Sequence, residues 1–220
     1  MRRRIMFIDR IDAGMQLAEK LNEYAGQENV LVVALRRGGV VTAAEIARWL
    51  KVPLDVLIVR KIVHPCQREI AMGAISETGA IVYNEDIINS LGVTKEYLRG
   101  EAARQREEIA RRQRMYRSGQ KLVNLGSKTD ILVDDGVAAG ATMKAAVETL
   151  QREQVGKLIV AVPVAAPAAA NELRSMADAF VCLEIPDAFM AVRSYYSVFL
   201  QVTDAEVVTL LGDFRELAAA

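Results

Sequence analysis

The sequence predicts an α/β fold: a doubly wound, mostly parallel β-sheet with a helical insertion and a C-terminal hood. Three observations lead to this prediction. Short aliphatic runs recur along the chain, each too short for a buried helix and rich in β-branched residues. A helical pattern follows most of them, and the joining loops are rich in glycine or alanine. Because strands and helices alternate, the crossovers should be right-handed and the strands should lie parallel in one sheet.

The composition is typical of one well-filled domain, residues 1–220, with 52% hydrophobic residues. The 28 basic and 28 acidic residues balance, so no overall field favours nucleic acid or an anionic membrane. No apolar run approaches the about 20 residues of a membrane span. Cys66 and Cys182 lack metal-binding spacing. We therefore expect reduced thiols in a cytoplasmic protein.

The first elements are a helix over about 12–25, with Asp12 as its N-cap, and a buried strand over 30–35. Arg36, Arg37, Gly38 and Gly39 follow that strand directly, and a helix over about 41–50 comes next. Guanidinium groups beside glycines can offer both positive charge and backbone amides to a polyphosphate. The alternative is an ordinary turn with surface arginines.

The next strand, over 54–59, ends in two cations, the second of which is Lys61. Positive charge at the carboxyl end of a parallel strand points into the crevice where α/β proteins bind ligands. Lys61 is therefore a phosphate candidate, with an edge lysine that extends into solvent as the alternative. The stretch 62–79 has no sustained periodicity, so we predict a loop.

A helical insertion is predicted over 86–118, after a short strand over 80–84. Its long helix, from about 94 to 116, carries many arginines and glutamates. Nucleic-acid binding is one interpretation. The mixed signs and the opportunities for pairs four residues apart favour a solvated helix instead.

The most informative stretch is a strand over 131–133, a loop and a helix over about 143–154. Asp134 and Asp135 end the strand, and small residues then lead into the helix. An anion is stabilised at the helix N-terminus, and small side chains let a phosphate approach the backbone. Carboxylates suit neutral hydroxyls or a divalent metal beside that phosphate. The candidate ligand residues are Asp134, Asp135, Gly136, Val137, Ala138, Ala139, Gly140, Ala141 and Thr142. The alternative is a strand-to-helix turn with solvated capping aspartates.

A strand over 157–162, a helix to about residue 176 and a strand over 179–183 complete the predicted sheet. The tail, residues 186–220, concentrates aromatic residues, among them Phe189, Tyr195 and Tyr196. A flat ring beside a ribose site could stack on an acceptor base. The alternative is an aromatic lid that packs against the sheet.

The run from Val133 to Thr142 resembles the PRPP (5-phosphoribosyl 1-pyrophosphate) signature of type I phosphoribosyltransferases. The resemblance implies a type I phosphoribosyltransferase-like fold, in which the acidic pair holds the ribose hydroxyls and the loop amides hold the 5-phosphate. It also implies that Arg37, Gly38 and Gly39 hold pyrophosphate, with Arg36–Arg37 as a candidate cis peptide. Arg36 and Lys61 join them as candidate pyrophosphate-binding residues, and the candidate catalytic residues are Arg37, Lys61, Asp134 and Asp135. It further implies a mobile loop over 62–79 and a base-binding hood over 186–220. The runs Phe7-x-Asp9-Arg10-x-Asp12-Ala13-Gly14 and Pro65-x-x-x-Glu69-x-Ala71-x-Gly73-Ala74 resemble a less characterised branch of predicted phosphoribosyltransferases.

Two departures from the family pattern concern the chemistry. Ala139 replaces a hydroxyl residue, which removes one phosphate hydrogen bond worth roughly 0.5–1.5 kcal/mol. Ala138 stands where purine-salvage members often carry a general-base aspartate. Hypoxanthine-guanine-type chemistry is therefore not expected.

The resemblance implies an enzyme that transfers phosphoribosyl from PRPP to a nitrogenous base or related acceptor and releases pyrophosphate. Mg²⁺ would arrive with PRPP and reach Asp134 and Asp135, and a homodimer is the form common in the family. One alternative is a non-catalytic PRPP or nucleotide sensor on the same fold. Phosphoester hydrolysis by Asp134 is a weaker alternative, because the expected partner acid is Gly136.

Overall fold

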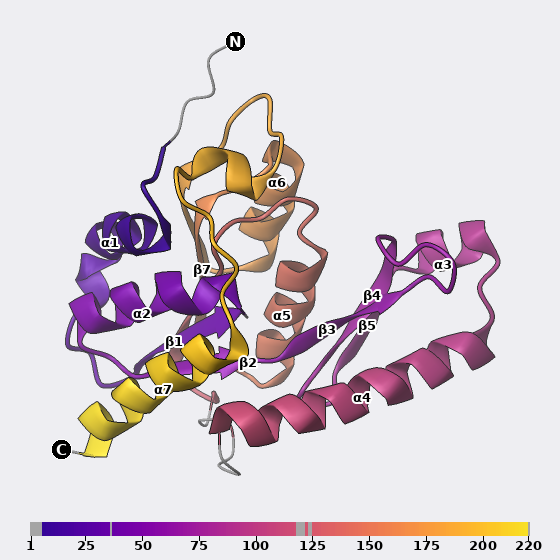
Figure 1. Cartoon of the computed structure of the whole chain (residues 1–220), viewed down its shortest axis with the longest axis horizontal. Coiled ribbons are helices and arrows are strands. Elements are labelled where there is room, and N and C mark those ends of the chain that lie inside the picture. Colours follow the sequence, from indigo (N-terminus) through magenta and orange to yellow (C-terminus); the bar gives the residue numbers. More distant parts are fainter. Residues whose placement is uncertain (1–5, 36, 118–121, 123–124, 220) are drawn as a thin grey trace.

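Five parallel strands form the central sheet of the computed structural model, which describes residues 6–35, 37–117, 122 and 125–219 (Figure 1). Their order is β2-β1-β6-β7-β8, and every neighbouring pair is parallel. The strands are β2 (Leu54–Leu57), β1 (Val30–Leu35), β6 (Thr129–Val133), β7 (Lys157–Val164) and β8 (Ala179–Glu184). The predicted doubly wound, mostly parallel sheet is confirmed. Its aliphatic strands exclude water on both faces, since β1 and β6 are buried throughout.

Helices cover both faces of this sheet. The helices α1 (Arg10–Lys20) and α2 (Gly38–Leu50) pack on one face, and α5 (Ala141–Arg152) and α6 (Pro167–Met176) on the other. Alternate residues of β6 enter the two cores: Ile131 and Val133 join the first, and Leu132 joins the second.

Several helices start earlier than predicted, and two of these starts matter for the site. The N-cap of α1 is Asp9, whose side chain accepts the amides of Ile11 and Asp12, so the expectation of Asp12 as cap was wrong. Helix α2 starts at Gly38, which places the glycine pair inside its first turn. A short 3-10 turn, η1 (Asn22–Tyr24), follows α1.

A second, antiparallel sheet forms an arm beside the core, with strand order β3-β4-β5 (Figure 1). Its elements are β3 (Val59–Val63), β4 (Ala71–Ser76), β5 (Ile81–Tyr83), α3 (Glu85–Leu91) and α4 (Lys95–Arg117). The predicted helical insertion is present as α3 and α4. The expectation of a loop throughout 62–79 was wrong for β4, whose glycine and small residues hid a strand pattern. Lys61 lies within β3, not at the end of a parallel strand as expected. Loop motion stays a prediction.

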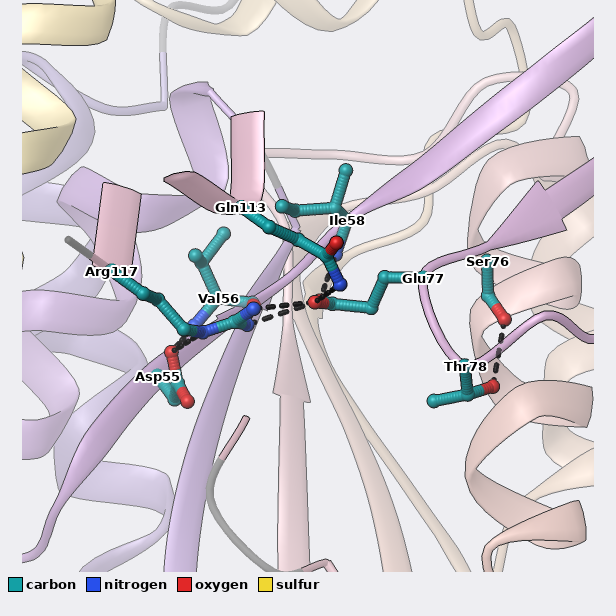
Figure 2. A network of polar contacts seen from close by, with 8 residues as sticks. All are labelled: Asp55, Val56, Ile58, Ser76, Glu77, Thr78, Gln113 and Arg117. Atoms are coloured by element: carbon teal, nitrogen blue, oxygen red, sulfur yellow. Dashed lines mark hydrogen bonds and ion pairs between the residues drawn. The ribbon is translucent and has the colours of Figure 1, made fainter. Parts of the chain in front are cut away.

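A buried network of polar side chains ties this arm to the core (Figure 2). Arg117, at the end of α4, donates from Nε to Asp55 Oδ1 at 3.1 Å and from Nη2 to Glu77 Oε1 at 3.0 Å. Glu77 Oε1 also accepts the amide of Ile58 at 2.8 Å, at the junction between β2 and β3. Because Arg117 is only 1% exposed, these two carboxylates are needed to stabilise its positive charge.

The C-terminal region contains a short 3-10 helix, η2 (Val192–Tyr195), and a long helix, α7 (Asp204–Ala219). Val207, Leu211 and Phe214 of α7 are buried in the same core cluster as α2 and α4. This helix was not predicted, although these three residues have helical spacing. Among the helices that the structure describes, none is long and apolar enough to cross a membrane.

Candidate functional site

The candidate site lies where the carboxyl ends of β1 and β6 meet. The chain leaves β1 toward one edge of the sheet and β6 toward the other, which makes this a topological switch point. Here the glycine pair packs on the acidic pair. A Cβ on Gly38 would lie 1.9 Å from Asp135 Oδ2, and one on Gly39 would lie 2.8 Å from Asp134 Oδ1. The structure thus brings together two motifs about a hundred residues apart in the sequence, and only glycine leaves room for the contact.

The loop after β6 presents bare backbone to a small cavity. Val137 is fixed by hydrogen bonds of 2.8 Å to Val164 O and from the amide of Ala166. Beyond it, the amides of residues 138–143 donate to no acceptor in the described part of the chain. Gly140, with φ 75°, turns the chain into α5. We call residues 138–143 the phosphate cradle. The cavity is about 200 Å³ and is lined by Lys61, Asp134, Gly136, Val137, Ala138, Ala139, Gly140, Ala141, Thr142 and Met143.

Asp134 faces this cavity from the end of β6. Burial, followed by the neighbouring charge of Asp135, raises the pKa of the Asp134 carboxyl well above its usual range. Its Oδ1 accepts the amide of Asp135 at 2.9 Å. A buried carboxyl group of this kind is well suited to form hydrogen bonds with neutral hydroxyl groups.

Asp135 points elsewhere, toward α1. Its Oδ2 accepts Arg10 Nε at 2.7 Å, and it is absent from the lining of the cradle cavity. Sequence reasoning gave Arg10 no role. Arg10 lies within the run Phe7-x-Asp9-Arg10, but nothing in that run identifies its distant partner.

The predicted cations occupy different places. Lys61 is exposed and lines the cradle cavity. A neighbouring cavity of about 280 Å³ is lined by Arg60, Lys61 and Arg68 together with Thr142, and it has no acidic lining residue. Arg37 Nη1 lies 4.0 Å from Asp204 Oδ1 of α7. The predicted role of Arg36, with the candidate cis peptide, falls outside the described residues.

Comparisons with known proteins decide the family. A family model described as "Phosphoribosyl transferase domain" matches residues 8–69 and 76–198. The chain belongs to this phosphoribosyl transferase family.

Similar proteins agree with this assignment. A Mycobacterium tuberculosis (strain H37Rv) protein named "Putative phosphoribosyl transferase Rv0571c" is 39% identical over 218 residues, or 97% of this chain and 49% of the relative. The chain thus spans about half the length of the curated relatives it matches. The solved structure of TT1426 from Thermus thermophilus is 41% identical with a TM-score of 0.82, covering 95% of this chain and 99% of that one. AQ2163 from Aquifex aeolicus, 12% identical with a TM-score of 0.50 over 80% of this chain and 74% of its own, is similar in fold alone.

The tail of this phosphoribosyl transferase chain buries two of the three predicted aromatic residues, and the third, Phe189, is half-buried. Tyr195 and Tyr196 are 9% and 5% exposed. Phe189 stacks on Tyr195 with ring centroids 5.6 Å apart, and Tyr196 packs between Phe7 and Phe199. The structure favours the alternative of an aromatic lid that packs on the core over base stacking by these two tyrosines.

Magnesium is a co-ligand that phosphoribosyl transferase resemblance implies. No group of three or more histidine, cysteine or acidic side chains could hold a metal ion within the described residues. Asp134 and Asp135 can supply at most two carboxylates, and that of Asp135 already pairs with Arg10. That donor set fits a Mg²⁺ ion carried mainly by substrate phosphates, because Mg²⁺ usually keeps waters and few protein ligands.

Proposed function

We propose that this chain binds PRPP and transfers its phosphoribosyl group to a nitrogenous base or related acceptor. The observation that carries the proposal is one cavity in which the unpaired amides of the phosphate cradle and the Asp134 carboxyl face the same space. Amides at a helix N-terminus favour a phosphate, and a carboxyl beside them favours sugar hydroxyls. A ribose 5-phosphate has these groups next to one another.

Different residues bind different groups of PRPP. The amides of the phosphate cradle and the hydroxyl of Thr142 bind the 5-phosphate, and Asp134 binds the ribose hydroxyls. The first turn of α2 at Gly38 and Gly39, with Arg37 and Lys61, binds the pyrophosphate. Mg²⁺ bound to PRPP would be held by Asp134 and neutralise phosphate charge.

Catalysis rests on positioning and electrostatics. The bond between ribose C1 and the pyrophosphate oxygen breaks, the pyrophosphate keeps the electron pair, and an acceptor nitrogen forms the new bond to C1. Lys61 and the α2 amides stabilise the negative charge that builds on the leaving pyrophosphate. The acceptor proton passes to solvent, because Ala138 supplies no base at the position where purine-salvage enzymes often have one.

The direct test combines calorimetry with a pyrophosphate-release assay. We expect Mg-PRPP to bind at micromolar affinity, and pyrophosphate to appear with at least one member of a panel of purine, pyrimidine and pyridine bases. Asp134→Asn should weaken binding about a hundredfold and slow pyrophosphate release. A wild-type protein that does not bind Mg-PRPP would reject the proposal.

A PRPP sensor is the second candidate, and Ala138 and Ala139 favour it because both lack functional side chains. The same experiment separates the two functions. A sensor would bind Mg-PRPP without releasing pyrophosphate for any acceptor, whereas an enzyme would turn over with at least one.

A further inference from the structure

Asp135 and Arg10 form a largely buried ion pair against Gly38 of α2. Their side chains are 15% and 10% exposed, and Arg10 Nε lies 2.7 Å from Asp135 Oδ2. Asp134 lines the cradle cavity, whereas Asp135 does not. Two consecutive aspartates that look equivalent in the sequence therefore have different surroundings.

Arg10 also contacts the C-terminal region over 196–200, which we call the hood strap. Its Nη1 donates to Leu200 O at 2.7 Å, and its guanidinium carbon lies 3.8 Å from the ring centroid of Phe199. From the same strap, the Tyr196 hydroxyl donates to the backbone oxygen of Asp135 at 2.6 Å. Both the side chain and the main chain of Asp135 are thereby connected to the hood strap.

The ion pair further supports the start of α2. A Cβ at Gly38 would meet Asp135 Oδ2 at 1.9 Å and Arg10 Nε at 2.8 Å, so the pair fills the space directly beneath this turn. One pair of side chains therefore contacts three parts of the site: the end of β6, the first turn of α2 and the hood strap.

We infer that Arg10 is a positioning residue, which acts through Asp135 to hold the hood strap and the α2 turn against the ribose site. Of the two aspartates, Asp134 lines the cradle cavity and Asp135 does not. This inference rests on the proposed function for its substrate. Arg10 also cancels the charge of Asp135 near a substrate that carries several negative charges, which favours binding of that substrate.

The test compares single variants by Mg-PRPP calorimetry and by hydrogen exchange at the hood strap. The amides of Ser197 and Val198 donate to Phe7 O and Ile8 O at 2.9 and 2.8 Å, so their exchange reports whether the strap is docked. We expect Arg10→Gln to weaken PRPP binding about tenfold and to speed exchange at both amides. Arg10→Lys should recover part of the PRPP affinity and part of the protection of the strap amides. Lysine keeps the positive charge but lacks the guanidinium group that reaches two acceptors.

The two aspartates should respond differently. Asp134→Asn is expected to weaken PRPP binding about a hundredfold while the strap amides stay protected. Asp135→Asn should weaken it by about tenfold at most, and combining it with Arg10→Gln should add little, because both act through one contact. Arg48→Gln is the matched control: Arg48 also pairs with a carboxylate, that of Glu45, and lies over a ring, that of Phe214.

The outcomes separate the inference from the proposed function. If wild-type protein binds Mg-PRPP but Arg10→Gln behaves like Arg48→Gln in both measurements, the positioning role is wrong and the proposed function stands. Equal losses for Asp134→Asn and Asp135→Asn would overturn the division between the aspartates. Failure of the wild-type protein to bind Mg-PRPP would reject the proposed function itself, together with the inference that depends on it.

Discussion

Asp130 is a fully buried carboxyl in the middle of the sheet, and neither of its oxygens has a hydrogen-bond partner among the described residues. Burial raises its pKa to about 7. The folded chain therefore holds a proton that the unfolded chain loses near pH 4. Stability contributed by the protonated form is complete below that pH and is lost progressively as the pH rises to about 7.

Asp130→Asn should remove this dependence, because an amide stays neutral. We expect the variant to be more stable than the wild type by about 1–3 kcal/mol at pH 8 and little changed at pH 4. Urea unfolding at the two pH values measures this difference. The exposed Asp213→Asn is the control; a parallel pH response in both variants would show that Asp130 is not the cause.

Gly38 tests the contact between the glycine pair and the acidic pair. Because a Cβ there would overlap Asp135 Oδ2 at 1.9 Å, Gly38→Ala should cost about 1–3 kcal/mol and weaken PRPP binding. Thermal unfolding and calorimetry give the two values. Gly100→Ala is the matched change within α4, where nothing lies within 4 Å of the new Cβ. It should stabilise the chain by roughly 0.5–1 kcal/mol, and a similar result at Gly38 would contradict the packing described.

Ala139→Thr tests the phosphate cradle. The new hydroxyl should add one hydrogen bond to the 5-phosphate, worth roughly 0.5–1.5 kcal/mol, and lower the Kd for PRPP about 2–10-fold. Ala139→Val has nearly the same shape without the hydroxyl and should give no gain. Calorimetry on the two variants decides the matter; identical affinities would mean that residue 139 does not contact phosphate.

At the scale of elements, α4 is attached to the core through Arg117. Arg117→Met leaves the carboxylates of Asp55 and Glu77 without this counter-ion, and we expect a loss of about 3–5 kcal/mol. Arg111→Met, on the solvent side of the same helix, removes an exposed pair with Glu108 and should cost under about 0.5 kcal/mol. Urea unfolding compares the two, and equal costs would contradict the importance of burial.

The elements also show what sequence patterns could and could not predict. Strand β1 and residues 131–133 of β6 were predictable because burial on both faces favours an aliphatic run, whereas Thr129 and Asp130 at the start of β6 lie outside that run. Strand β4 was missed because most of its residues are small, and Gly73 interrupts the pattern. A Cβ at Gly73 would lie 2.3 Å from Val82 O, so the residue that hid the strand is required by its pairing with β5.

For the site, residue types in one loop were predictable, but contacts between distant segments were not. The acidic pair and the small residues after it are adjacent in sequence, and helix-terminus chemistry follows from them directly. The partner of Asp135 is 125 residues away in α1. No local pattern distinguishes an arginine that pairs with such a carboxylate from one in solvent, which is why Arg10 was found only in the structure.

At the scale of the whole molecule, the arm places two cations beside the phosphate cradle. Lys61 of β3 and Arg68 of the turn between β3 and β4 line a cavity that Thr142 of α5 also lines. Both side chains belong to exposed residues. We expect a polyphosphate bound at the cradle to attract them, and the turn over 64–70 to close over the ligand, as lids do in many enzymes.

Hydrogen exchange with and without Mg-PRPP measures this closure. We expect amides in 64–70 to exchange several-fold more slowly when PRPP is bound, and less so in Arg68→Gln, because that change removes a charge that attracts the phosphates. The turn at Gly92, between α3 and α4 on the same arm, serves as an internal control and should not change. Unchanged exchange over 64–70 at saturating PRPP would mean that this turn does not move when PRPP binds. The cations of the arm would then contact phosphate only from the positions they have in this structure.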